Sequence, residues 1–438
     1  MSLIEWQLDR LVGPTHHFGG LGVGNVASQR SAGTLSNPAA AALQGLEKMR
    51  WIAQATGAQL IVPPQPRPDF EVLRNLGFSG SDADVLKRAR DDSPDLLSAA
   101  TSCSAMWTAN AATVVPDIDC MNHDRTGTSL SVANLVSSIH RTTEPSQSQR
   151  DLKKALPDSC RILPPLKSGY AMRDEGAANH MRLSVAGASA GIHVFVYGDQ
   201  DPVPTRYQAR QSLASCRAIA RRHDLVPENV FFLKQHPDAI DAGAFHNDVV
   251  AMSHLDRWIH HADAFFEASE TYEKIESRFH ELFGQDLIRI SVAPETLSLP
   301  TTVGTYLFNS QIISRDTDSP PKIVCTRQVE QNPSARRLVE QWCQSEVFQS
   351  VHYVDLDQSM SGGGGPACLR LRIPLPIDLS DTIPKPARFS ESSYDRLRDL
   401  VQSEYSTELM IDDLARIDFH QQASETQRKV VRLLTTGQ

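Results

Sequence analysis

Short apolar runs alternate with longer segments of helical period along most of the chain. From Asn37 the sequence NPAAAALQGLEKMRWIAQAT predicts a helix, because Asn37 can cap its start, Pro38 suits the first helical position and Gly57 can end it. A second helical pattern covers residues 208–223. Helices and strands are therefore mixed, which predicts the α/β fold class.

Several short stretches are strand-like, and some alternate apolar with polar residues, as half-covered strands do. They are residues 59–62, 193–198, 230–234, 288–292, 322–326, 352–356 and 368–375. Since the Pro- and Ser-rich pieces between them are all short, residues 1–438 are predicted to form one compact unit. The charged, helix-like segment 390–438 is expected to lie at its periphery.

Composition and charge narrow the classes of partner. With 40% hydrophobic and 22% charged residues, the 438-residue chain resembles an ordinary globular protein. Its formal net charge of −9 repels phosphate backbones, and no Lys/Arg run is interleaved with aromatic residues, so nucleic acid is not expected as a partner.

Neither a membrane partner nor secretion is expected from the sequence. No run of 18 apolar residues occurs, and the first twenty residues carry Glu5, Asp9 and Arg10 in place of a basic start and an apolar run. A cytoplasmic location is therefore predicted. The seven cysteines are scattered and odd in number, which favours reduced thiols over disulfides or zinc, and no metal or organic cofactor is expected.

The sharpest local feature is SMSGGGGPACLRLR, residues 359–372, where four glycines and a proline precede Cys368 at the head of a strand. Glycine runs are costly to order and persist where side chains would block a turn or a ligand. Cys368 could thus be a nucleophile at a loop-to-strand junction. A flexible loop before a buried structural cysteine is about equally compatible with the pattern.

A nucleophilic cysteine needs a base or a cation beside it, because its free pKa of about 8.5 keeps it protonated at neutral pH. Fifteen histidines are available, and His246 in GAFHNDVV is the most suggestive of them. Asp248 follows it at +2, so an extended segment would direct both side chains to one side. A capped turn is about as compatible with these residues.

Two further loops carry candidate residues. In RDEGAANHMRL, Glu175 could orient a cationic substrate, although a solvated acidic turn is favoured by the sequence alone. The N-terminal loop THHFGGLGVGNVAS is glycine-rich but lacks the strand–GxGxxG–helix context of a dinucleotide site. We interpret it as a backbone-lined substrate loop. Its adjacent histidines His16 and His17 lack the spacing of a metal site.

Taken together, the motifs resemble the N-succinylarginine dihydrolase family. In chain order they are VGPTHHFGGLGVGNVAS, GFSGSD, MWTANAAT, DEGAANH, FVYG, RYQARQ, FHNDVV, TYLFNSQ and GGGGPACLRLR. They span residues 12 to about 375, the predicted core. The resemblance implies a pentein fold, in which five ββαβ modules surround a central channel with a pseudo-fivefold axis.

The resemblance also implies an activity and its residues. The expected reaction converts N2-succinylarginine and two waters to N2-succinylornithine, two ammonia and carbon dioxide, with Cys368 as nucleophile, His246 as acid and base, and Glu175 beside them. The implied substrate contacts are Gly20, Leu21, Gly24, Asn25, Ala27, Ser28, Asn110, His140, Arg141, Arg210 and Asp248. Arginine side chains suit carboxylates by bidentate bonding. The family resemblance further implies a homodimer.

One departure from the family pattern concerns a substrate contact: the family has asparagine where this chain has Gly362. Losing an amide donor could weaken substrate binding by about 1–3 kcal/mol. Three other functions stay open at this point. They are a related dihydrolase or deiminase for free arginine, a non-catalytic binding protein that keeps the fold, and an amidinotransferase that needs an amine acceptor.

Overall fold

The computed structural model describes residues 2–122, 124–167, 169–187, 190–314 and 319–436. Its strands form five three-stranded sheets. In each sheet one pair of strands is antiparallel and the other parallel. Because a parallel pair needs a long crossover, a helical segment lies between the two parallel strands of every sheet. The repeated unit is thus a ββαβ module.

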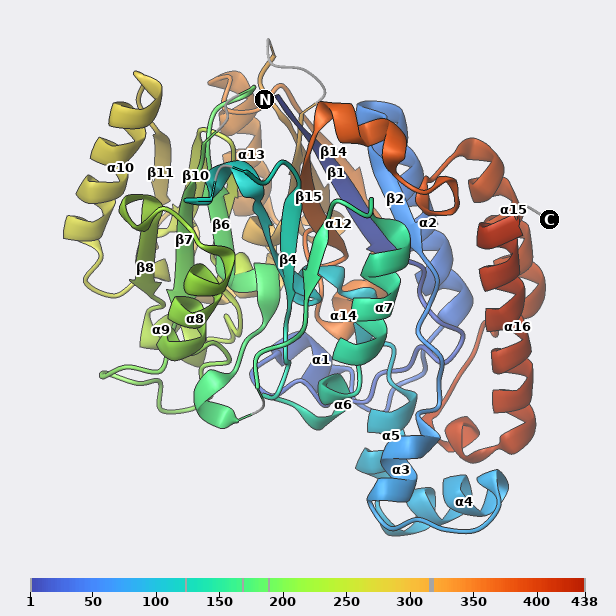
Figure 1. The fold of residues 1–438 in the computed structure, drawn as a ribbon. Coiled ribbons are helices and arrows are strands. Elements are labelled where there is room, and N and C mark those ends of the chain that lie inside the picture. Colours follow the sequence, from blue (N-terminus) through green and yellow to red (C-terminus); the bar gives the residue numbers. More distant parts are fainter. Residues whose placement is uncertain (1, 123, 168, 188–189, 315–318, 437–438) are drawn as a thin grey trace.

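Four modules follow one another along the chain (Figure 1). The first has β3 (Ala112–Pro116), β4 (Thr128–Val132), α6 (Ile139–Thr142), α7 (Pro145–Ala155) and β5 (Arg161–Leu163). The second has β6 (His180–Leu183), β7 (Ile192–Tyr197), α8 (Leu213–His223) and β8 (Val230–Lys234). The third has β9 (Ala251–His254), β10 (Arg257–His261), α10 (Ser269–Phe283) and β11 (Ile288–Val292). The fourth has β12 (Gln311–Ile313), β13 (Lys322–Thr326), α12 (Arg327–Gln331), α13 (Pro333–Gln344) and β14 (Ser350–Val354).

The fifth module joins the two ends of the core. Strand β15 (Arg370–Pro376) pairs antiparallel with β1 (Leu3–Arg10), and β2 (Gln59–Val62) then pairs parallel with β1 after α2 (Pro38–Thr56). Leu8 lies directly opposite Leu371 in this register. The pairing closes the succession of modules, and the predicted five-module pentein fold is confirmed.

The remaining helices lie outside the modules or connect them. They are α1 (Val26–Arg30), α3 (Phe70–Asn75), α4 (Asp82–Asp92), α5 (Pro94–Thr101), α9 (Pro237–Asp241), α11 (Leu299–Thr305), α14 (Asp357–Gly362), α15 (Glu391–Glu404) and α16 (Ile417–Thr436). In Figure 1, α3 and α4 project at the lower edge, and α15 and α16 stand beside α2 at the right. The helices predicted for the C-terminal segment are confirmed.

Local capping explains where the helices begin. The Asn37 side chain accepts a hydrogen bond from the Ala40 amide, and Gly57 ends α2 with φ of 72°, as predicted. Helix α8 begins at Leu213 and not at residue 208, because the Ser212 side chain caps it there. The strands expected at 352–356 and 368–375 are each displaced by one or two residues, to the bounds of β14 and β15.

The alternating pattern of β15 separates two environments. Leu371, Ile373 and Leu375 are fully buried in a cluster with residues of β1 and β2. Arg370 and Arg372 occupy the alternate positions and face the other way. This period-two pattern predicts a half-covered strand. The face that carries Arg370 and Arg372 lines a cavity.

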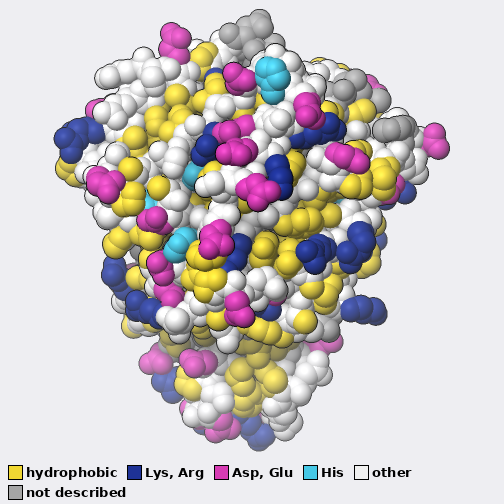
Figure 2. Space-filling view, turned by 90° about the vertical axis from the view of Figure 1, so that its left-hand side faces the viewer, with side chains coloured by type: hydrophobic (Ala, Val, Ile, Leu, Met, Phe, Trp, Pro, Cys, Tyr) yellow, Lys and Arg dark blue, Asp and Glu magenta, His cyan; other side chains and the backbone are white. Residues whose placement is uncertain are grey.

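The surface carries both signs of charge. On the face that includes α10, acidic and basic side chains are interspersed among apolar ones (Figure 2). Among the described residues, we find no helix that combines the length and the apolar character needed to cross a membrane.

Candidate active site

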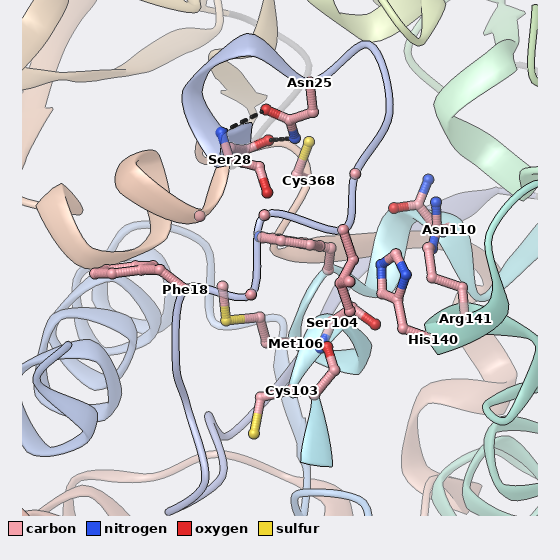
Figure 3. A pocket seen from close by; sticks show the side chains of 18 of the residues that line it. Phe18, Asn25, Ser28, Cys103, Ser104, Met106, Asn110, His140, Arg141 and Cys368 are labelled. Atoms are coloured by element: carbon pink, nitrogen blue, oxygen red, sulfur yellow. Dashed lines mark hydrogen bonds between the residues drawn. The ribbon is translucent and has the colours of Figure 1, made fainter. Parts of the chain in front are cut away.

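A cavity, the front cavity, collects the side chains that the sequence singled out. Figure 3 shows Asn25 and Ser28 of the N-terminal loop, the Cys103–Asn110 segment, His140, Arg141 and Cys368 around it. Arg210, His246 and Gly362 also line it. Its empty volume is about 670 Å³, open solvent at the mouth included.

Cys368 is 3% exposed and is held by one asparagine. The Cys368 amide donates to Asn309 Oδ1 at 3.1 Å, and the Ala367 amide donates to the Asn309 carbonyl at 2.9 Å. The thiol itself donates to Asp248 Oδ2 at 3.5 Å. Burial, followed by the nearby Asp248 carboxyl, raises the pKa of Cys368 well above its usual value, so the resting group is a neutral thiol.

The glycine run before Cys368 makes a tight turn packed against other segments. Gly363 ends α14 with φ of +93°, where a non-glycine residue would be strained. Its carbonyl accepts hydrogen bonds from Asn25 Nδ2 at 2.9 Å and from the Tyr306 hydroxyl at 3.0 Å. A Cβ at Gly363 would lie 2.0 Å from Asn25 Oδ1, so glycine is required for this approach. The turn thereby connects the N-terminal loop to the nucleophile candidate.

His246 lies with Cys368 on the front cavity and is 2% exposed. Its Nε2 is 3.1 Å from Glu175 Oε2, and its Nδ1 is buried without a hydrogen-bond partner among the described residues. Burial lowers the pKa of His246 to about 4 against the opposing effect of Glu175, so the ring is neutral near pH 7. Because the carboxylate accepts from Nε2, the lone pair lies on Nδ1, as a general base requires.

Glu175 is fully buried, so the solvated acidic turn favoured by the sequence is wrong. Its carboxylate accepts from Ser137 Oγ, from Arg141 at 2.5 Å and from His246. Burial alone would raise the pKa of Glu175, but Arg141, His246 and Arg210 lower it well below its usual range. The sequence pattern missed this because the compensating cation comes from α6, 34 residues away.

Asp248 does not lie on the same side as His246, so the predicted extended arrangement is wrong. Residues Asn247–Val249 form a 3-10 turn, which rotates successive side chains away from a strand's alternation. Asp248 lines a second cavity, the rear cavity. Its polar lining includes Glu5, His180, Arg182, Asn247, Asp248, Arg370 and Arg372. Burial raises the pKa of Asp248 to about 7.

The front cavity has two further hydrogen-bond donors, the charged Arg210 and the neutral His140. Arg210 donates to the Val23 carbonyl at 2.5 Å and stacks 4.7 Å above the Phe245 ring, with no carboxylate paired to it among the described residues. Burial lowers the pKa of Arg210 to about 10, which leaves it charged at neutral pH. Burial and the neighbouring Arg141 lower the pKa of His140 to about 3, so His140 is a neutral donor.

The structure brings most of the predicted substrate residues to the front cavity. Those lining it are Gly20, Leu21, Asn25, Ser28, Asn110, His140, Arg141 and Arg210. Gly24 and Ala27 belong to the same loop but do not line it. Asn25 Oδ1 caps α1 by accepting from the Ser28 amide at 3.1 Å, which gives this loop its shape.

Sequence reasoning missed Asn309 and Ser137. Asn309 is fully buried, and besides holding Cys368 it donates through Nδ2 to the Asp248 carbonyl at 3.2 Å. Its segment TYLFNSQ belongs to the motifs that carry the family resemblance, and that is the signal that could have identified it. Ser137 sits in a loop with no distinguishing pattern, so its bond to Glu175 could not have been predicted.

The arrangement suits attack by a thiol on a cationic carbon centre. A buried thiol shares the front cavity with a neutral imidazole, and the imidazole nitrogen that has no partner among the described residues can take and return a proton. Glu175 holds the imidazole, and Asp248 flanks the sulfur from the other side. A bound cation would compensate the carboxylates and favour the thiolate.

Comparison with known proteins agrees with this chemistry. A family model described as succinylarginine dihydrolase matches residues 2–438. The N-succinylarginine dihydrolase of Chromohalobacter salexigens is 41% identical over 419 residues, covering 94% of this chain and 92% of that protein. That of Idiomarina loihiensis is 40% identical over 424 residues, covering 94% and 93%.

Among solved structures, the N-terminal domain of ArgZ bound to product, an arginine dihydrolase from the ornithine-ammonia cycle in cyanobacteria, is similar in fold. The TM-score is 0.53 at 15% identity, covering 85% of this chain and 98% of that one.

Proposed function

This chain belongs to the succinylarginine dihydrolase family, and from that premise we propose that it hydrolyses N2-succinyl-L-arginine. The products are N2-succinyl-L-ornithine, two ammonia and carbon dioxide, and two waters are consumed. The reaction is a step of arginine catabolism that follows succinylation of the amino acid. The observation that carries the proposal is Cys368 on one cavity with His246, whose Nδ1 is free and whose Nε2 is held by Glu175.

The first hydrolysis begins with attack of Cys368 Sγ on the guanidinium carbon. As the S–C bond forms, the thiol proton passes to His246 Nδ1; His246 then protonates the departing nitrogen, the C–N bond breaks and ammonia leaves. His246 next takes a proton from water, which adds to the amidino carbon. The C–S bond breaks, the thiol is regenerated, and a ureido compound remains.

The second hydrolysis repeats the cycle on the ureido carbon. Cys368 adds again and a second ammonia leaves, which gives a thiocarbamate. Water then displaces the sulfur and forms a carbamate on the side-chain nitrogen. When this nitrogen is protonated, its bond to carbon breaks and carbon dioxide leaves, giving N2-succinylornithine.

Substrate recognition follows from the charges of the front cavity. Arg210 has no paired carboxylate in the described part of the chain, which supports its binding to a carboxylate of the substrate. Arg141 is engaged with Glu175, so the geometry supports an orienting role of Glu175 toward His246 more directly than a contact with the guanidinium. The protein is further proposed to act in the cytoplasm as a homodimer, which size-exclusion chromatography with light scattering would test.

The decisive experiment is the ammonia released per N2-succinylarginine consumed, with free arginine in parallel. We expect two ammonia per succinylarginine and no reaction with arginine. One ammonia would make the protein a deiminase, and activity on arginine alone would move it to a different branch of the fold. Ammonia release without an added amine excludes an amidinotransferase, and absence of turnover on either compound would favour a binding protein.

Glu175→Gln tests the orienting role. It keeps the size of the side chain but removes the charge that holds Arg141 and the Nε2 proton of His246. We expect kcat to fall about 100- to 1000-fold, in the range of lost general acid–base catalysis. Ser137→Ala removes one neutral hydrogen bond to the same carboxylate and should cost far less. Equal effects of the two variants would contradict the role.

A further inference from the structure

The rear cavity begins at Asp248, whose Oδ2 lies 3.5 Å from the Cys368 sulfur. Cys368 lines the front cavity and Asp248 the rear one, so this contact lies between the two cavities. The rear cavity has an empty volume of about 920 Å³, open solvent included.

The rear cavity contains several charged side chains, and most are paired. Arg182 binds Asp119 through two bonds, at 2.6 and 3.0 Å. Arg372 lies 3.2 Å from Glu5 and donates twice to the Ser253 carbonyl at 3.0 Å. His180 contacts His193 at 2.9 Å, which in turn contacts Asp119 at 2.9 Å.

Arg370 is different from these groups. Among the residues that the structure describes, none forms a hydrogen bond or ion pair with its guanidinium, and its Nε is buried without a partner. Asp9 lies directly opposite Arg370 across the β1–β15 pair, where a salt bridge would be expected. However, the Asp9 carboxylate is bound by Lys48 at 2.5 Å and by Gln59 at 2.8 Å.

Among the described residues, the sheet therefore leaves one guanidinium without a partner, on a polar cavity whose Asp248 contacts the reacting sulfur. Asp248 lies on this lining and forms no ion pair among the described residues; its buried carboxyl has its pKa raised to about 7 and is partly protonated at neutral pH. An unpaired arginine is complementary to a planar oxyanion, which it can bind through two parallel hydrogen bonds.

We propose that Arg370 and the rear cavity bind the anion formed in the second hydrolysis, namely the carbamate. This inference rests on the proposed function, because only the second hydrolysis creates an anion at the position of the guanidinium carbon. The first hydrolysis converts a cation to a neutral ureido group. Because it forms no anion at this carbon, a cation behind the sulfur would not stabilise its product. Arg370 thus favours completion of the reaction over release of the ureido compound.

Arg370→Met tests the proposal, with Arg372→Met as the matched control on the same strand and the same cavity. Supplying N2-succinylcitrulline, the ureido compound, isolates the second hydrolysis. For Arg370→Met we expect at least a tenfold loss on this compound but less than a threefold loss of the first ammonia from succinylarginine. Ammonia per substrate should fall from two toward one as the ureido compound accumulates, whereas Arg372→Met should keep the wild-type ratio.

Two results would overturn the proposal. One is an Arg370→Met enzyme that still releases two ammonia with both stages slowed equally, which would mean a merely structural role. The other is equal loss in both arginine variants. If wild type itself releases a single ammonia, the proposed function fails first, and this distinguishes the two failures.

A second measurement covers the case in which Arg370→Met does not fold. Bicarbonate and nitrate, planar oxyanions of the proposed class, should inhibit hydrolysis of N2-succinylcitrulline by wild type more strongly than chloride at equal ionic strength. Arg370→Lys keeps the charge but loses the planar fork, so this selectivity should weaken at least threefold in it. Wild-type inhibition that does not distinguish bicarbonate from chloride would refute the site.

Discussion

The front and rear cavities flank the same Cys368–Asp248 contact but differ in which of their charged side chains are paired. On the front cavity Arg141 is paired with the buried Glu175, while Arg210 has no carboxylate partner among the described residues. In the rear cavity the arginines are paired except for Arg370, which has no partner within the described ranges of the chain. In the part of the chain that the structure describes, each cavity thus keeps one guanidinium without a carboxylate partner among paired groups.

The difference lies in what surrounds each unpaired cation. Arg210 stacks on Phe245 beside a neutral histidine, His140, in a cavity shaped by the backbone of the N-terminal loop. Arg370 protrudes from a strand whose opposite face is the apolar core. The front cavity is suited to a long substrate with carboxylates at its far end, and the rear cavity to a small anion.

Cys368→Ala should have the largest effect, because both cavities would lose the reacting group between them. We expect kcat to fall by at least about 10⁴-fold with substrate binding retained, as for other nucleophile deletions. Stopped turnover with a normal dissociation constant, measured by calorimetry, would meet this expectation. Cys103→Ala is the control thiol, since Cys103 lines the front cavity but is hydrogen-bonded to Thr15. Substantial activity of Cys368→Ala would exclude covalent catalysis by this residue.

Arg210→Met should separate the front cavity from the rear one. Losing a charge-assisted hydrogen bond costs about 1.5–3 kcal/mol, which corresponds to about a 10- to 100-fold rise in KM for succinylarginine. The ratio of ammonia to substrate should stay at two, because Arg210 does not line the rear cavity. Arg206→Met, on the same segment but stacked on Tyr207, should leave KM unchanged. A changed product ratio in Arg210→Met would mean that the two cavities are not separate in function.

Local signals predicted the parts of the fold whose causes are local. The start and end of α2 are set by its own neighbouring residues Asn37, Pro38 and Gly57, whatever the helix packs against. The alternation of apolar and polar residues identifies the strand β15. The pairing of β1 with β15 joins residues more than 360 positions apart, such as Leu8 and Leu371, and no local pattern encodes it. Here only the resemblance to a family could supply the closure.

The residues of the candidate site also fall into two groups, those that a local sequence motif identifies and those whose placement depends on other segments. Cys368 and His246 lie in motifs whose residue types indicate chemistry by themselves. The burial of Glu175 could not be predicted, because an acidic loop is expected at the surface until Arg141 arrives from another module. The direction of Asp248 depends on a 3-10 turn, and alternation along the chain therefore predicted the wrong side.

Acid should destabilise the protein through its buried neutral histidines in both regions. The pKa of His140 on the front cavity is lowered to about 3, and that of His180 on the rear cavity lies well below its usual value. Because the unfolded chain binds protons near pH 6.5 and the folded one does not, stability falls as the pH drops from about 6.5. Each such histidine contributes up to about 1.4 kcal/mol per pH unit.

His140→Gln should remove one of these contributions. Urea unfolding between about pH 7.5 and 4.5 should show a shallower decline in the free energy of unfolding for this variant than for wild type. An identical pH dependence would mean that His140 is protonated in the folded state.

Gly362→Asn, which restores the residue of the family pattern, should have the smallest effect. A Cβ at this position would lie 3.1 Å from Trp107 Cζ2, so the indole must shift slightly, at a cost of about 1 kcal/mol of stability. Gly362→Ala is the matched control, because it adds the same Cβ without the amide. If the two variants lose equal stability and keep the wild-type kcat/KM, Arg210 and the loop backbone suffice for substrate binding. Faster ammonia release in Gly362→Asn alone would show instead that a missing amide donor limits the front cavity.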